Sequence, residues 1–186
     1  MLRPMRFILP AFSAGALLLA GCGDSTTEPG GESEVISRVT LTLTPPAGAA
    51  LTSFIDDADG NGPGAPSAQQ GALTLARNTT YTGTIRFENR LATPVEDITT
   101  EVQAEANEHR VFYTASGSGV TITTTDTDGQ GRPLGLRFTT AVGATAAPGQ
   151  ISVVLCHYDK VTKPAAATSC TVETDISVAF AFTIQP

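Results

Sequence analysis

Residues 170–184 alternate between apolar and polar side chains over a long stretch. Successive side chains of a β-strand point to opposite faces, so this spacing predicts a strand with one buried face. Its apolar side chains all occupy even-numbered positions, namely Val172, Ile176, Val178, Phe180, Phe182 and Ile184. A strand of this kind needs neighbouring strands and a covering layer, which indicates a fold rich in β-structure.

The same alternation recurs in shorter segments that are separated by turn-forming residues. These segments are residues 35–43, 50–55, 71–77, 81–88, 111–115, 120–124, 134–138 and 151–158. Residues 151–158 are apolar on both faces, which is typical of a central strand. The pattern predicts a mainly β fold, an immunoglobulin-like antiparallel β-sandwich of about nine strands. An up-and-down barrel is the alternative.

One stretch between these segments changes to helical period. Thr93 suits an N-cap and Pro94 suits the first helical position. The apolar stripe of the predicted helix consists of Val95, Ile98, Val102 and Ala106, and His109 falls on the same stripe. We therefore expect one inserted amphipathic helix that lies across the sandwich with its apolar stripe inward.

The N-terminus resembles a bacterial lipoprotein signal. Arg3 and Arg6 precede a short apolar run, and Leu-Ala-Gly-Cys follows at residues 19–22. This run is shorter than the about 20 apolar residues that a spanning helix needs. We expect residues 1–21 to be removed and Cys22 to carry lipid. An ordinary secretory signal that happens to contain a cysteine is the alternative.

The sequence divides into three parts on this interpretation. Residues 1–21 are the signal peptide, residues 22–34 a flexible lipid-anchored tether and residues 35–186 a single β-sandwich domain. The tether is rich in Gly, Ser, Thr, Pro and Glu, with almost no apolar surface to bury. Gly23 after the lipidated cysteine is compatible with export to the outer membrane, so we expect a cell-envelope location with an unassigned membrane face.

The charge balance excludes one class of partner. The chain has 18 Asp and Glu residues against 11 Lys and Arg residues, a formal net charge of −7. Nucleic-acid binding needs a basic surface to neutralise phosphates, so no nucleic-acid partner is expected. A metal ion or another cationic ligand suits an acidic protein better.

Cys156 and Cys170 form one even pair if Cys22 carries lipid. In an oxidising compartment such a pair predicts a disulfide. Two thiolate metal ligands are the alternative, although these normally have closer spacing or further Cys and His partners.

Metal-ligating side chains gather at the predicted helix. Glu101, Glu105 and His109 recur every four positions and would line one ridge. Carboxylate and imidazole together suit Zn²⁺, and His157 is the second histidine that would complete a site, with Asp175 or Glu173 on the last strand close by. The alternative is a helix-stabilising pair of Glu105 with His109, and a His157 that forms hydrogen bonds at a strand end.

A second candidate site is a loop that resembles the start of a calcium-binding loop. Asp57, Asp59 and Asn61 alternate before Gly62, as in the first half of an EF-hand loop. The bidentate acid expected later in that loop is replaced by Ala68, so only a partial Ca²⁺ site is predicted. No nucleophile elbow or phosphate-binding glycine loop occurs, and we expect a protein that is not an enzyme.

Residues 101–113, EVQAEANEHRVFY, resemble the E-E-A-D-E-H-Q-V-F-Y signature of small lipoproteins found largely in Bacteroidota. Those proteins are often labelled "type 1 periplasmic binding fold superfamily protein". Further matching pieces are residues 57–60, 65–66, 78–81, 126–128, 133–136, 157–160 and 173–176. The label implies a two-lobed α/β binder of sugars or amino acids, whereas the periodicity predicts strands with one helix. The two cysteines are a departure from the family pattern.

These observations favour a lipid-anchored envelope binding module that captures a divalent metal or another small ligand, with Zn or Ca as the candidate ions. Its partners would be the membrane, through the lipid on Cys22, and an envelope transport protein for which it is an accessory. A structural or protein-interaction module without a ligand is the alternative. The distance between His109 and His157 distinguishes the two, because ligands of one ion each lie about 2 Å from it.

Overall fold

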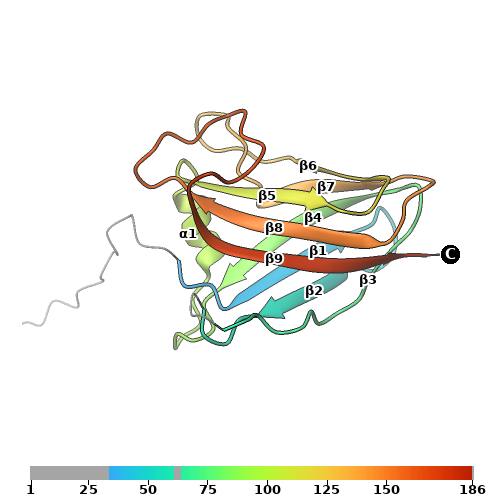
Figure 1. Ribbon diagram of the computed structural model, residues 1–186, viewed down its shortest axis with the longest axis horizontal. Helices are drawn as coiled ribbons and strands as arrows, with labels where there is room; N and C mark the ends of the chain where they lie inside the picture. The colour runs from blue at the N-terminus through green and yellow to red at the C-terminus, as the bar shows by residue number, and fades with distance from the viewer. Residues whose placement is uncertain (1–33, 61–63, 186) are drawn as a thin grey trace, which may run out of the picture.

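The computed structural model describes residues 34–60 and 64–185. These residues form nine β-strands and one α-helix, which confirms the prediction of a mainly β fold and its strand number. Figure 1 shows the strands stacked in two layers with the helix at one end. The elements are β1 (Arg38–Thr44), β2 (Leu51–Asp56), β3 (Leu73–Leu75), β4 (Thr79–Glu88), α1 (Ile98–Ala104), β5 (His109–Ala115), β6 (Val120–Thr124), β7 (Arg137–Val142), β8 (Gly149–His157) and β9 (Glu173–Ile184).

The strands form two sheets. One sheet has the order β2-β1-β4-β7-β6, and the other has the order β3-β9-β8-β5. Every neighbouring pair is antiparallel except β3 and β9, which are parallel. The expectation of a fully antiparallel arrangement is therefore wrong at this edge, because the chain passes from β2 in one sheet to β3 in the other before it returns to β4.

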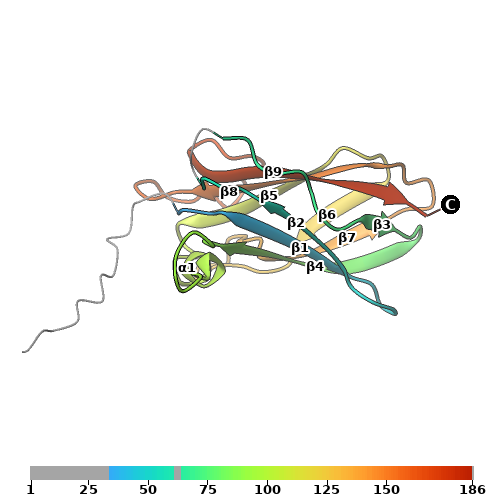
Figure 2. The same cartoon turned by 90° about the horizontal axis from the view of Figure 1, so that it is seen from below.

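A shared hydrophobic core lies between the two sheets, as the edge-on view in Figure 2 illustrates. The even-numbered residues of β9 from Ile176 to Phe182 are buried, as the alternation predicts. β8 contributes Ile151, Val153 and Leu155, each fully buried. Burial of apolar surface at about 25 cal/mol per Å² makes this core the main source of stability. The core-facing rows of β5 and β8 continue to the end of the sandwich that carries His109 and His157.

The helix is shorter than the sequence predicts. It begins at Ile98, with Asp97 rather than Thr93 at the N-cap, and ends before Glu105. Residues 89 and 96 pair through two backbone hydrogen bonds of 3.1 Å, so the segment between them is a closed loop instead of a first helical turn. Ile98 and Val102 are buried as expected, whereas Val95 is exposed.

His109 is also placed differently from the prediction, since it opens β5 instead of closing the helix. The regular spacing of Glu101, Glu105 and His109 therefore does not produce one helical ridge. No helix among the described residues is long and apolar enough to cross a membrane.

The predicted disulfide between Cys156 and Cys170 is present, with Cα atoms 5.6 Å apart. It joins the end of β8 to the segment that precedes β9, and it packs with Phe112 and Tyr158 in a small second cluster outside the main core. In the chain-entropy model, a cross-link across a sequence separation of 14 stabilises the fold by about 3 kcal/mol. The bridge therefore secures the strand end that carries His157.

Candidate metal centre

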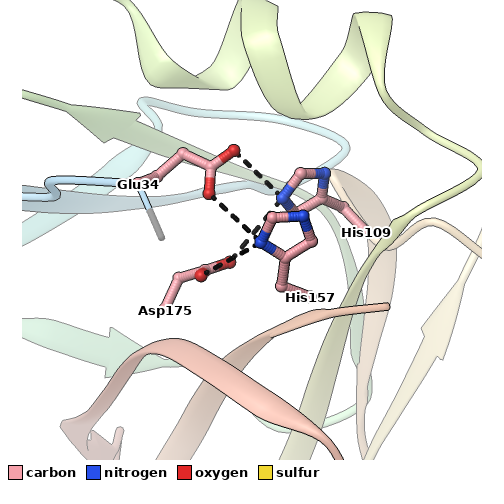
Figure 3. A group of neighbouring side chains, drawn as sticks. All are labelled: Glu34, His109, His157 and Asp175. Atoms are coloured by element: carbon pink, nitrogen blue, oxygen red, sulfur yellow. Dashed lines mark ion pairs between the residues drawn. The ribbon is translucent and has the colours of Figure 1, made fainter. Parts of the chain in front are cut away.

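Four side chains that can ligate a metal meet at one end of the sandwich, between the sheets and beneath α1 (Figure 3). They are Glu34, His109, His157 and Asp175. His109 and His157 are directly opposite each other in the β5–β8 ladder, and their stacked rings have centroids 4.3 Å apart. The two histidines that the sequence places 48 positions apart are thus neighbours.

Strand alternation explains why both rings point inward. In β8 the buried row of Ile151, Val153 and Leu155 continues at the next odd position, which is His157. In β5, His109 lies two residues before the buried Val111 and therefore on the same face of the strand. Each histidine is therefore the last member of a core-facing row. Both are buried, with 0 % exposure for His109 and 2 % for His157.

Asp175 reaches the site through an irregularity in the ladder. The core-facing residues of β9 are even-numbered, so a regular strand would direct Asp175 outward. Between β8 and β9 the register shifts: Leu155 pairs with Ile176, but Cys156 pairs with Thr174. This β-bulge leaves Asp175 as the extra residue, and its side chain is fully buried beside the histidines. Bulges commonly redirect a side chain at functional sites.

Glu34 comes from the segment that leads into β1. The backbone of Ser37 donates a 2.9 Å hydrogen bond to the Glu88 carbonyl and accepts one from the Asp57 amide. Ile36 is fully buried in the core. These contacts hold the segment against the sandwich, and the side chain of Glu34 is only 9 % exposed. Glu34, which the sequence interpretation places at the end of the tether, therefore packs against the folded domain.

The ligand atoms of these four residues lie close together, with one atom of each within 4.8 Å of the others. His109 Nε2 lies 3.1 Å from Glu34 Oε1 and 3.7 Å from Asp175 Oδ2. His157 Nδ1 lies 3.7 Å from Glu34 Oε2 and 3.6 Å from Asp175 Oδ1. Tetrahedral ligands at about 2.0–2.1 Å from Zn²⁺ would be about 3.3 Å apart. Three of these four distances are too long for hydrogen bonds, and each carboxylate directs one oxygen at each histidine. Binding of one ion through a single oxygen of each carboxylate would bring the ligands to the tetrahedral spacing.

One nitrogen of the His109 ring contacts the backbone in the way that is usual for a metal-ligating histidine. Its Nδ1 lies 3.4 Å from the backbone carbonyl oxygen of Glu105. A carbonyl only accepts, so Nδ1 carries the proton in this contact and Nε2 is left to face Glu34 and Asp175. Hydrogen bonding of the second nitrogen to a backbone carbonyl is the usual arrangement for a metal-ligating histidine.

Burial and charge act against each other at this site. Burial by itself lowers the pKa of His109, but the carboxylates of Glu34 and Asp175 outweigh it, so the pKa is raised overall. For Glu34, burial acts to raise the pKa, and its interactions with His109 and His157 hold it below the usual value. Neither ring nitrogen of His157 has a hydrogen-bond partner among the described residues, although both are buried. A buried polar atom in that state is costly unless a ligand binds it.

A buried ion pair secures the turn that leads into β5. The Lys163 ammonium donates hydrogen bonds to the carbonyl oxygens of Ala106, at 2.6 Å, and His109, at 3.0 Å. The same ammonium lies 2.9 Å from Asp128 Oδ2, which also accepts from Arg132. Burial lowers the pKa of Lys163. Burial also acts to raise the pKa of Asp128, but Lys163 and Arg132 hold the pKa of Asp128 well below its usual value. This network fixes the backbone at His109.

The structure brings together only part of the ligand set predicted from the sequence. His109 and His157 form the centre, and Asp175, named as a neighbour, joins them. Glu105 lies beside His157 in a second group with Glu108. Glu101 belongs to neither group of close ligand atoms and is exposed on α1. The helix ends before His109, so Glu101 and His109 do not share a helical ridge. Glu34 was not among the metal ligands predicted from the sequence.

The predicted calcium loop is described only in part. Asp57 is buried and Asp59 exposed, and the Asp59 amide lies 3.4 Å from Asp57 Oδ1. Burial, followed by the contact with Asp59, raises the pKa of Asp57. Asn61 lies outside the described residues, as does the predicted lipidation site Cys22. Within residues 34–60 and 64–185, neither Asp57 nor Asp59 belongs to a group of three or more close ligands.

A surface groove lies at the opposite end of the sandwich from the histidines. Its lining includes Pro45 and Pro46 after β1, Tyr81 in β4 and Gln185 after β9. Glu34 precedes β1 and Asp175 lies near the start of β9, so the lengths of both strands separate the groove from the metal centre. The groove therefore offers no substrate cleft to the four ligands.

No protein-family model matches the chain, and neither curated proteins nor solved structures show a significant match to it.

Proposed function

We propose that this protein is an envelope lipoprotein module that binds one divalent transition-metal ion, Zn²⁺ by preference, through Glu34, His109, His157 and Asp175. The observation that carries the proposal is the meeting of four ligating side chains at one largely buried place, where one ligand atom of each lies within 4.8 Å of the others. Two imidazoles and two carboxylates gathered in this way can converge on one tetrahedral ion.

The chemistry of the ligands favours Zn²⁺ over Ca²⁺. Calcium prefers six to eight oxygen ligands, whereas two imidazoles and two carboxylates are a borderline set that suits zinc. The two carboxylates also balance the charge of a divalent ion, so an occupied site would be neutral and could remain buried. Calcium is therefore the second choice at this site.

The number of protein ligands supports binding rather than catalysis. Catalytic zinc sites usually have three protein ligands and an open position for water, whereas four protein ligands close the coordination sphere. We therefore propose a module that captures or stores the ion and is not an enzyme. An accessory role for an envelope uptake system follows from the lipoprotein signal at residues 19–22 and the lipid proposed on Cys22.

The alternative is a structural or protein-interaction module of immunoglobulin-like kind. In that case the four side chains would be a buried polar network that only orients the strands. Such a network would bind no metal, and replacement of one carboxylate would change stability without changing any metal affinity. The resemblance of residues 101–113 to envelope lipoproteins is compatible with both functions.

Isothermal titration of residues 23–186 with Zn²⁺, Cu²⁺ and Ca²⁺ tests the proposal. We expect tight Zn²⁺ binding, and Asp175→Asn should weaken it by at least about 100-fold, because even the loss of a group that only hydrogen-bonds a metal ligand costs about 10–100-fold in metal affinity. The matched control is Glu173→Gln, an exposed carboxylate two residues away on β9. Absence of Zn²⁺ binding, or equal affinity in Asp175→Asn and Glu173→Gln, would support the structural alternative.

A further inference from the structure

A second group of ligand atoms adjoins the proposed metal centre. Glu105, Glu108 and His157 each offer one ligand atom, and these atoms lie within 4.8 Å of one another. His157 therefore belongs to both groups. Figure 3 shows its Nδ1 directed at Glu34 and Asp175 and its Nε2 directed away from them. Nε2 is buried and has no hydrogen-bond partner among residues 34–60 and 64–185.

Backbone hydrogen bonds hold the turn that carries Glu105 and Glu108 against the strand end of His157. Glu105 caps α1, and its amide donates a 2.8 Å hydrogen bond to the Glu101 carbonyl. The Glu108 amide donates to the Glu105 carbonyl at 2.8 Å, so the chain turns back on itself. The Glu108 carbonyl accepts a 2.6 Å hydrogen bond from the Tyr158 amide, directly after His157. The turn is thus fastened to the strand end that carries the histidine.

Glu105 and Glu108 differ from the inner ligands in exposure. Both are half-buried, whereas His157 and Asp175 are buried. The turn is also held from its other side by Lys163, which hydrogen-bonds the carbonyls of Ala106 and His109. A fixed pair of carboxylates between solvent and an unpartnered imidazole nitrogen has the composition of a cation site.

We infer that Glu105, Glu108 and Nε2 of His157 form a second, outer divalent-cation site, which shares His157 with the inner site. This inference rests on the proposed function, since the inner ion occupies Nδ1. When both sites are filled, His157 bridges the two ions and its remaining ring proton leaves to solvent. The outer site is weaker than the inner one because it has three ligands, two of them half-exposed.

Metal stoichiometry tests the inference. Equilibrium dialysis of residues 23–186 against excess Zn²⁺, with elemental analysis, should give two ions for the wild type. The double variant Glu105→Gln/Glu108→Gln should retain one tightly bound ion. The control Glu96→Gln/Glu101→Gln makes the same charge change on exposed carboxylates of the same region and should retain two. If the wild type and Glu105→Gln/Glu108→Gln each bound one ion, the outer site would be overturned and the proposed function would stand. If the wild type bound no ion, both the outer site and the proposed function would be overturned.

Imidazole ¹⁵N spectra give a second measurement that does not depend on variants. The chain has 2 histidines, and both lie at the site, so each ring signal can be assigned. The first equivalent of Zn²⁺ should shift His109 Nε2 and His157 Nδ1. The second equivalent should shift His157 Nε2 more than either nitrogen of His109, whose Nδ1 lies 4.0 Å from the Glu105 carboxylate. A second equivalent that leaves His157 Nε2 unaffected would contradict the outer site.

Discussion

Saturating Zn²⁺ should raise the free energy of unfolding of residues 23–186 by about 4 kcal/mol when the free ion is about 1,000 times its dissociation constant. The reason is that the four ligands come from four separate parts of the chain: the segment before β1, the start of β5, the end of β8 and the start of β9. They are close together only in the folded state, so the binding free energy adds to stability. Urea unfolding with and without Zn²⁺ measures the gain.

Glu34→Gln is the informative variant for this prediction. Glu34 precedes the first strand, so its replacement leaves every strand residue unchanged. If affinity falls by about 100-fold, the same Zn²⁺ concentration should stabilise the variant by only about 1.4 kcal/mol. If Zn²⁺ raised the free energy of unfolding equally in the wild type and in Glu34→Gln, the stabilising ion would be bound at a site other than the one formed by Glu34. Mg²⁺, which prefers oxygen ligands in octahedral geometry, is the control ion and should give no comparable gain.

Lys163→Met should destabilise the domain by about 3 kcal/mol, the low end for a broken buried ion pair, because Asp128 loses one of its two cations and keeps only Arg132. The side chains of Lys163 and Asp128 are both fully buried and lie 2.9 Å apart. The substitution also leaves the carbonyls of Ala106 and His109 without the donor that they share. Chemical denaturation of the metal-free protein measures the loss.

The control for this prediction is Lys160→Met. Lys160 also pairs with an aspartate, Asp159, at 3.0 Å, but its side chain is 87 % exposed. Exposed ion pairs contribute little to stability, so its unfolding midpoint should match that of the wild type. Equal effects of Lys163→Met and Lys160→Met would show that the buried network is not needed. We also expect Lys163→Met to weaken Zn²⁺ binding, because the network fixes the turn that positions His109.

Alternation in the sequence was sufficient to predict the β-rich architecture, and the even pair of cysteines that remains besides Cys22 predicted the disulfide. It also contained the signal for both histidines, since His157 continues the odd-numbered buried row of β8 and His109 that of β5. The helical interpretation of residues 93–109 concealed the second row. A tertiary feature, the paired loop between Asn89 and Glu96, delays the start of α1 and cannot be read from local periodicity.

The two carboxylates of the centre show why the rest of the site was not predictable. Asp175 occupies an outward position by period two, and only the bulge opposite Leu155 and Cys156 directs it inward. A register shift of this kind depends on how two strands pair, not on either strand alone. Glu34 lies in a polar segment whose composition is typical of a linker, and its position follows from the burial of Ile36 two residues later.

The most direct test of the metal centre is a crystal structure of residues 23–186 grown with Zn²⁺ and measured on both sides of the zinc absorption edge. Anomalous difference density should place one ion about 2.0–2.2 Å from His109 Nε2, His157 Nδ1 and one oxygen each of Glu34 and Asp175. Density found only at exposed carboxylates, with no peak between the two histidines, would contradict the proposed function.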